Sequence, residues 1–517
     1  MTQASLAQHG IWVTAGAGES TAYHLPVVIR FGHGLDVGAL SKACAAVADR
    51  HPLLTAAVQD RDGVAHLVTG PTPMLRIAVD GESLAHEISQ EIARPFDLTT
   101  GPLARFVLFA GSTLVITAHH LALDGYSKDL LVRDLAAFYN GEIPPALAST
   151  FTSWAAAERE RVLGGTPEAA TFWQDRWSEP PPLVIADRVL TSRQAGPGAV
   201  IDFPLSVPAV DGVTRFEAVL AAVHALLHRY GNTRVTTAVD LSTRTPDAAE
   251  LIGPMVNELP VTSEPDAGTP FDSYARSLSA TVRAIYPHRD VPLARAAGHI
   301  RPHAALTPIS ISYRRRQPEP TFLGIGSAVE WLAFNGAVRG DLQLQIVDSG
   351  TDLSVSLRYS PAAAPVAATF ADHLQAVTGR LAADPTLPVG GLLPTTDSSL
   401  TSESPIKPVE PIEPVEPIEP VEPIEPVGSF ESGVVGTPVA SPRAADLADQ
   451  IRAIWEEVLK ISPIGDHDDL FDLGGHSLTM TQIIARMRKT LKIQVPLDVF
   501  FDDPTVSGVV RAVLSDQ

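Results

Sequence analysis

The stretch that decides the fold of most of this 517-residue chain reads His119-His120-Leu121-Ala122-Leu123-Asp124-Gly125. Two runs of β-forming residues, 103–110 and 114–118, precede it, and the dipeptide Gly111-Ser112 joins them as a turn. A histidine that follows a strand and precedes a glycine turn can project into a cleft while its backbone is held firmly. Because histidine has an ordinary pKa of about 6.5, it can take or pass on a proton near neutral pH. The pattern therefore indicates a candidate site at this histidine pair.

The residues alone leave two other interpretations of the pair open. Adjacent histidines could bind zinc, or they could be buried groups with a purely structural role. The sequence holds no second cluster with the spacing of metal ligands, so we expect no metal. Asp124, four positions after His120, could return in a tight turn and order the loop.

Composition narrows the class of protein. Acidic side chains outnumber basic ones by 59 to 38, which disfavours nucleic acid as the main partner. The single cysteine, Cys44, cannot form an internal disulfide, and the first residues lack the pattern of a signal peptide. No run of about 18 uncharged apolar residues predicts a membrane span. We therefore expect a cytoplasmic, multidomain protein that has no membrane partner.

Residues 405–427 repeat Pro-(Val/Ile)-Glu with a period of three. Proline at every third position removes a backbone donor and fixes φ, which excludes a helix or a central strand. The repeat is typical of polyproline II, so we expect residues 396–440 to form an extended, semi-rigid linker. It separates a large α/β unit, residues 1–395, from a small helical unit, residues 441–517.

The large unit resembles the condensation domains of non-ribosomal peptide synthetases, whose core motif is HHxxxDG. The resemblance covers most of residues 5–395 and rests on several motifs in the family's order. They are Ser5-Leu6-Ala7-Gln8 with Trp12, Arg50-His51-Pro52-Leu53-Leu54-Thr55, Pro95-Phe96-Asp97-Leu98 with Gly101-Pro102-Leu103 and Arg105, Ile252-Gly253-Pro254-Met255-Val256-Asn257, residues 288–292 and, more weakly, residues 151–157.

This resemblance implies a mixed α/β fold of two chloramphenicol-acetyltransferase-like lobes, residues 1–180 and 181–395, with a tunnel between them. An upstream donor carrier protein would present an acyl thioester at one face. A downstream carrier would present an aminoacyl thioester at the other.

The resemblance also implies roles for individual residues. His120 would accept the amine proton, position the nucleophile or stabilise the tetrahedral intermediate, and the sequence does not choose among these. The Gly125 amide could face a developing oxyanion. His119 and Asp124 would be structural, and Arg244 is our candidate to pair with Asp124. Leu293 and residues 310–313 depart from the family pattern, which leaves the acceptor, and amide versus ester formation, open.

The second strong pattern is Asp469-Leu470-Phe471-Asp472-Leu473-Gly474-Gly475-His476-Ser477-Leu478. Ser477 opens an apolar-periodic helix, where it could be an N-cap or could carry a phosphate that the helix start favours. The stretch resembles the attachment motif of peptidyl carrier proteins. Ser477 would then carry 4'-phosphopantetheine, added by a phosphopantetheinyl transferase, on an all-α four-helix carrier domain.

No stretch resembles the phosphate loop of adenylation domains, a Walker loop or a GxSxG nucleophile elbow. We therefore expect a separate adenylation enzyme to load the carrier in trans. The predicted function is a peptide synthesis module that condenses an upstream acyl or peptidyl thioester with the substrate on its own carrier. Two alternatives are an acyltransferase that uses a free amine or alcohol, and an inactive platform that docks the carrier.

Overall fold

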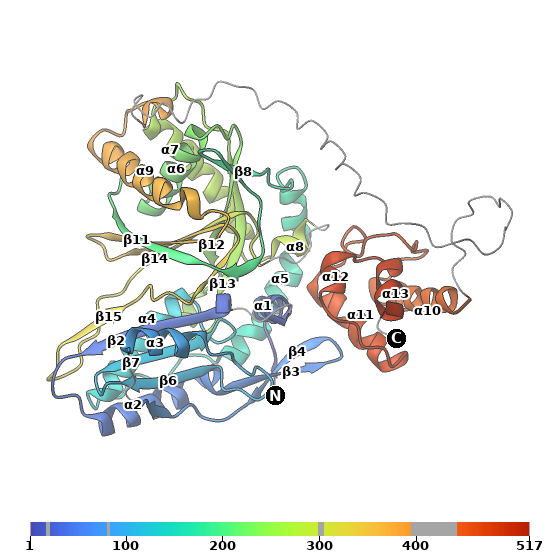
Figure 1. Ribbon diagram of the computed structural model, residues 1–517, viewed down its shortest axis with the longest axis horizontal. Helices are drawn as coiled ribbons and strands as arrows, with labels where there is room; N and C mark the ends of the chain where they lie inside the picture. The colour runs from blue at the N-terminus through green and yellow to red at the C-terminus, as the bar shows by residue number, and fades with distance from the viewer. Residues whose placement is uncertain (1, 17–20, 80–82, 298–303, 394–441, 516–517) are drawn as a thin grey trace, which may run out of the picture.

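The computed structural model describes residues 2–16, 21–79, 83–297, 304–393 and 442–515. The predicted linker, residues 396–440, lies outside the described residues. Two large sheets and three small ones of two or three strands, with helices around them, build the described part of residues 2–393, and a cluster of helices builds residues 442–515 (Figure 1). The predicted mixed α/β fold and the all-helical C-terminal region are confirmed. None of the described helices combines the length and the apolar character needed to span a membrane.

The first sheet has five strands in the order β15-β2-β7-β6-β5. They are β2 (His24–Phe31), β5 (Leu75–Ile77), β6 (Ala104–Phe109), β7 (Thr113–His119) and β15 (Ser327–Glu330). The predicted turn at Gly111-Ser112 joins the antiparallel pair β6 and β7. Strand β15 comes from the range expected for the second lobe, yet it pairs with β2 and completes the first sheet.

Alternating side chains of the first sheet fill two cores. Val27 and Ile29 pack with helices α2 (Val37–Arg50) and α4 (Gly125–Tyr139). Val28, between them, packs on the other face, with Ile88 and Ile92 of α3 (Leu84–Ala93). Because successive strand residues face opposite sides, apolar residues at consecutive positions indicate a sheet buried on both faces.

The second sheet has six strands in the order β11-β18-β17-β14-β12-β13. They are β11 (Ala199–Leu205), β12 (Val235–Ser242), β13 (Val256–Ser263), β14 (Ile309–Arg315), β17 (Leu342–Asp348) and β18 (Leu353–Tyr359). Helices α6 (Arg215–Arg229), α7 (Phe271–Ile285) and α9 (Ala364–Ala383) cover its apolar face. Figure 1 shows that the opposite face of this sheet is turned toward the first sheet and α4.

Helix α5 (Phe151–Gln174) connects the two halves. Phe151 at its start packs on first-half residues such as Leu53 and Leu103, and Trp173 near its end lies in the core of the second half. The remaining elements of the large unit are β1 (Thr2–Gln3), α1 (Leu6–Gly16), β3 (Ala56–Arg61), β4 (Val64–Thr69), β8 (Leu183–Ile185), β9 (Arg188–Leu190), β10 (Ala195–Pro197), α8 (Leu293–Ala296), β16 (Ala337–Arg339) and short 3-10 turns.

Four helices form the C-terminal unit, as predicted. They are α10 (Pro442–Leu459), α11 (Ser477–Thr490), α12 (Val499–Asp502) and α13 (Val506–Ser515). Trp455, Phe471 and Phe500 are buried at its centre. Val13 of α1 is fully buried in the same cluster, so the helical unit packs on the N-terminal helix of the large unit. Figure 1 shows α11 and α12 beside α1 and the β3–β4 hairpin.

Candidate active site

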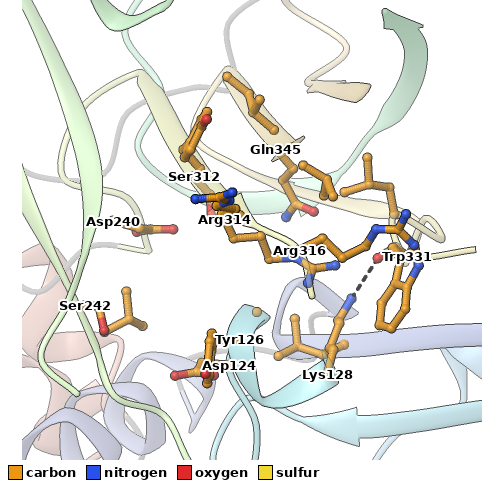
Figure 2. Close-up of a pocket in the computed structure, with 18 of the residues that line it drawn as sticks. Asp124, Tyr126, Lys128, Asp240, Ser242, Ser312, Arg314, Arg316, Trp331 and Gln345 are labelled. Carbon is orange, nitrogen blue, oxygen red and sulfur yellow. Dashed lines mark hydrogen bonds between the residues drawn. The ribbon is translucent and has the colours of Figure 1, made fainter. Parts of the chain in front are cut away.

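Two cavities meet at His120. The larger one has a volume of about 840 Å³ and lies between the two sheets. Figure 2 shows Tyr126 and Lys128 of α4 on one side of it and Ser312, Arg314 and Gln345 of the second sheet on the other. The smaller cavity has a volume of about 260 Å³, and Ser477 lies in its wall. His120 lines both cavities.

Hydrogen bonds hold both the backbone N–H and one ring nitrogen of His120. It directly follows β7, and its N–H donates to the carbonyl of Tyr23 at 2.8 Å. Its Nδ1 lies 2.8 Å from the carbonyl oxygen of Leu123. Because a carbonyl can only accept, Nδ1 carries the proton and Nε2 keeps a free lone pair. Burial, and then the charge of Arg339, lower the pKa of His120, so the ring is neutral at pH 7.

His119 faces away from both cavities. It is 4% exposed and its ring lies among those of Tyr23, His24 and Phe96. Its Nδ1 accepts a hydrogen bond from the N–H of Leu121 at 3.2 Å. Burial lowers the pKa of His119 well below its ordinary value. This neutral ring is therefore a packing residue beneath the loop that presents His120.

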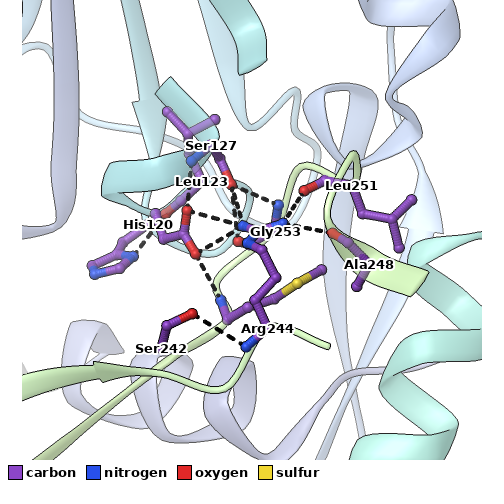
Figure 3. A network of polar contacts seen from close by, with 10 residues as sticks. His120, Leu123, Ser127, Ser242, Arg244, Ala248, Leu251 and Gly253 are labelled. Atoms are coloured by element: carbon purple, nitrogen blue, oxygen red, sulfur yellow. Dashed lines mark hydrogen bonds and ion pairs between the residues drawn. The ribbon is translucent and has the colours of Figure 1, made fainter. Parts of the chain in front are cut away.

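Asp124 joins the histidine loop to the second half of the large unit (Figure 3). Its Oδ1 accepts from the N–H of Ser127 at 2.7 Å, which caps helix α4. Its Oδ2 accepts from the N–H of Met255 at 3.0 Å and from Nη2 of Arg244 at 3.1 Å. Both side chains of the ion pair are almost fully buried. The structure therefore brings Asp124 and Arg244 together across the two halves.

Arg244 extends this network. Its Nη1 donates to the carbonyls of Ala248 and Leu251, and its guanidinium lies over the ring of Tyr126. The hydroxyl of Ser127 donates to the carbonyl of Gly253 at 3.1 Å and is also 3.1 Å from that residue's N–H. These bonds satisfy most polar groups of this buried network, where unpaired groups are costly, whereas Nε of Arg244 has no partner among the described residues.

Gly125 is the first residue of α4 and lines the larger cavity. An N–H in the first turn of a helix has no carbonyl within the helix to bind. A Cβ at this position would lie 3.3 Å from Cδ of Arg314, so the absence of a side chain lets the arginine approach the helix start.

The helical unit docks through α11. The hydroxyl of Thr481 donates to the carbonyl of Gly63 at 2.6 Å, and Arg488 pairs with Asp60 at 2.8 Å. Gly63, at the tip of the β3–β4 hairpin, has a φ of +77°. A Cβ there would lie only 2.2 Å from the carbonyl oxygen of Thr481, so this close approach requires glycine.

Ser477 begins α11, and His476 is the N-cap. Ser477 and His120 both line the smaller cavity. A flexible group attached to the serine would therefore enter a cavity that His120 also lines. The guanidinium of Arg295 lies close enough to lower the pKa of both His9 and His476. A helix start and a nearby arginine both fit an attached phosphate.

The two departures from the family pattern lie on different cavities. Leu293 lines the smaller cavity with Ser477, whereas Ser312 and Tyr313 line the larger one. The sequence does not distinguish these positions, because it does not show which strand face meets which cavity.

Several cavity residues were not predicted, among them Arg314, Arg339 and Arg358. A signal for two of them exists in the alternation of residues 309–314, Ile-Ser-Ile-Ser-Tyr-Arg, and of residues 353–359, Leu-Ser-Val-Ser-Leu-Arg-Tyr. In a sheet with one face on the core, such alternation places every polar residue on the other face. Among the described residues, no group of three or more histidine, cysteine or carboxylate side chains could hold a metal ion.

Comparisons with known proteins match both parts of the chain. Residues 1–400 match the family model "Condensation domain", and residues 449–513 match "Phosphopantetheine attachment site". The chain is similar to chondramide synthase cmdD of Chondromyces crocatus, with 26% identity over 77% of this chain and 11% of that protein. It is also similar to phosphinothricin tripeptide synthetase PhsB of Streptomyces viridochromogenes, with 29% identity over 56% of this chain and 27% of that protein.

The chain thus spans well under a third of the length of these two curated relatives. Among solved structures it is similar to the condensation domain of the monacolin K polyketide synthase MokA, with a TM-score of 0.64 and 19% identity. That likeness covers 75% of this chain and 98% of the other, and it shows a shared fold.

The substitution Asp124→Asn should destabilise the large unit by about 3 kcal/mol, because it leaves the buried charge of Arg244 without a partner. His120→Ala removes one hydrogen bond and should cost about 1 kcal/mol. Urea unfolding of the full chain, followed by tryptophan fluorescence, compares the two. Equal stability of Asp124→Asn and the wild type would show that the network does not hold the two halves together.

The substitution Arg488→Glu should lower the docked population of the helical unit about two- to fivefold, since it replaces an attraction to Asp60 by a repulsion. The second change Asp60→Arg should restore docking. Distances between spin labels placed on α2 and α13 measure the docked fraction. Arg486→Glu is the matched control, because Arg486 pairs with Glu457 inside the helical unit. An equal effect of both reversals would contradict this interface.

Docking should weaken as the pH falls from 7.5 to 5.5. Burial, together with Arg295, lowers the pKa of His9 and of His476 to about 4 in the docked state. Below pH 6.5 an undocked histidine takes up a proton that the docked one does not, so acid favours release. At pH 5.5 the docking equilibrium constant should be about tenfold lower than at pH 7.5 for each histidine whose pKa returns to its ordinary value on release.

The same spin-label distances, recorded across this pH range, test the effect. His476→Asn keeps an N-cap residue on α11 but does not titrate, so this variant should lose part of the pH dependence. An unchanged pH profile in the variant would exclude His476 as a source.

Proposed function

Because the chain belongs to the condensation-domain family and continues into a phosphopantetheine attachment domain, we propose that it joins an upstream acyl or peptidyl thioester to the substrate on its own carrier, forming an amide. The donor thioester comes from a separate upstream carrier protein. One observation carries the proposal: Ser477 and His120 line the same cavity, although 356 residues (477 − 120 − 1) separate them in sequence.

His120 acts on the attacking amine. Its Nε2 has a free lone pair because the Leu123 carbonyl holds the proton on Nδ1. The amine donates a hydrogen bond to Nε2 and attacks the donor carbonyl carbon. As the C–N bond forms and the C–S bond breaks, Nε2 accepts the amine proton and returns it to the departing thiolate. A histidine that is neutral at pH 7 suits this role, since a protonated ring could not accept.

The start of α4 stabilises the charge that develops on the carbonyl oxygen. The N–H of Gly125 belongs to the first turn of this helix, and Gly125 and His120 both line the larger cavity. Both a free amide and the positive end of a helix dipole favour an oxyanion. Asp124 and Arg244 position these groups and do not touch the reacting atoms in this proposal.

Ser477 is the attachment residue for 4'-phosphopantetheine. When bound, this group supplies a thiol that holds the acceptor substrate as a thioester. The helix start and Arg295 favour its phosphate, and the smaller cavity guides the attached substrate toward His120. A phosphopantetheinyl transferase adds the group, and a separate adenylation enzyme loads it in trans.

The proposal predicts distinct masses for three forms of the full chain purified from its producing host. The wild type should carry an extended acyl chain on the phosphopantetheine arm. His120→Ala should carry only the unextended acceptor substrate, and Ser477→Ala should carry neither group. Mass spectrometry of the intact proteins measures these loads.

The same extended load on the wild type and on His120→Ala would contradict the proposal, because bond formation would then occur elsewhere. That result would favour a platform that docks the carrier. An arm that persists in Ser477→Ala would refute the assignment of the attachment residue.

A further inference from the structure

One face of the second sheet is polar across three neighbouring strands. Residues at alternate positions of β14, β17 and β18 contribute Leu, Ile and Val to the helix-covered core. The intervening residues are polar except for Val347 of β17; the polar ones are Ser310, Ser312, Arg314, Gln343, Gln345, Ser354, Ser356 and Arg358. In register, Gln343 lies between Ser310 and Arg358, and Gln345 lies between Ser312 and Ser356. This polar face forms part of the wall of the larger cavity.

Several hydrogen-bonding atoms of this face have no partner among the described residues, although they are buried. They are Nε of Arg358, Nη2 of Arg314 and the hydroxyls of Ser310 and Ser356. Arg358 is 3% exposed, and it lines the larger cavity. Its guanidinium donates to neutral oxygens, on Asn335 and Ala333, both at 3.3 Å, and the nearby charge of Asp202 on the neighbouring strand β11 acts on it without forming an ion pair. Buried donors without acceptors are costly unless a ligand supplies the acceptors.

Positive charge exceeds negative charge in the wall of the cavity. Its cationic side chains are Lys128, Arg314, Arg315, Arg316, Arg339 and Arg358, whereas its carboxylates are Asp124 and Asp240. Arg314, Arg316 and Arg339 each pair with a carboxylate, on Asp129, Glu319 and Glu258. Within the described part of the chain, no carboxylate forms an ion pair with Arg358.

Lys128 shows the effect of this excess. Its Nζ donates to the carbonyls of Pro26 and Trp331, and no carboxylate of the described residues lies within ion-pair distance of it (Figure 2). Burial and then the charges of Arg314 and Arg358 lower its pKa well below the ordinary value. A buried excess of positive charge with unsatisfied donors favours an anion that accepts several hydrogen bonds.

We propose that the larger cavity binds the donor acyl group and that this acyl group carries a carboxylate, which Arg358 binds. The inference rests on the proposed function, in which the carrier's own substrate arrives from Ser477 through the smaller cavity. The larger cavity is then the side open to the donor. Arg358 acts as a specificity residue there, because neutral chains leave its guanidinium unpaired.

Binding of acyl-pantetheines to the full chain tests the inference without turnover. Adipoyl-pantetheine and hexanoyl-pantetheine have the same number of carbons and differ in one terminal carboxylate. The wild type should bind the adipoyl compound roughly tenfold to a hundredfold more tightly, as expected for hydrogen bonds to a charged group. Arg358→Met should abolish this preference, and Arg358→Lys should restore part of it. Arg188→Met, which changes an exposed arginine of β9 outside the cavity, is the matched control.

Arg358→Met should also unfold at the same or a higher temperature than the wild type, because replacing an unpaired buried charge by an apolar side chain is neutral or stabilising.

Equal binding of the two compounds by the wild type would overturn the inference, and so would a preference that persists in Arg358→Met. Condensation that proceeds equally well with neutral donors would also overturn it while leaving the proposed function intact. A preference in binding without condensation of either donor would count against the proposed function alone.

Discussion

The buried ion pair between Asp124 and Arg244 is the contact on which the geometry of the site depends. Asp124 caps α4 directly after the loop that holds His120, and Arg244 follows β12 of the second sheet. The pair therefore fixes the distance between the loop that holds His120 and the opposite wall of the cavity. Each charge is stable in this position only because the other is present. Ser127 and the segment around Gly253 complete the network, so the two halves are joined by polar contacts at the site itself.

The second sheet has an apolar face that stabilises the fold and a polar face that lines the larger cavity and suits it to bind a ligand. Helices α6, α7 and α9 cover the first of these faces and exclude water from it. The other face retains buried groups without partners, such as the hydroxyls of Ser310 and Ser356. A protein selected for stability alone would replace them with apolar residues. Unsatisfied polar groups beside a cavity are therefore better explained by what the cavity binds.

Local patterns in the sequence predicted much of this molecule. The loop at His120, the helix start at Ser477 and the hairpin around Gly111 each depend on residues close together in the chain. The shared cavity of Ser477 and His120 depends on contacts between distant segments, such as Thr481 with Gly63, and no local pattern reports them. The entry of β15 into the first sheet was missed for the same reason. Arg314 of β14 and Arg358 of β18 are a different case. The alternation of polar and apolar residues around them is visible in the sequence, and it was not interpreted as a polar sheet face.

The contact between α11 and the β3–β4 hairpin has a kinetic consequence. Its polar part consists of hydrogen bonds of Thr481 with Gly63 and His9 and two ion pairs at the surface, beside the packing around Val13, which is little for two separate proteins. Because both partners belong to one chain, each encounter is intramolecular, and even a weak interface is occupied often. Such an interface also dissociates quickly. In the function proposed above, Ser477 must leave this position to be loaded and then return, and a short residence time of the helical unit suits that exchange.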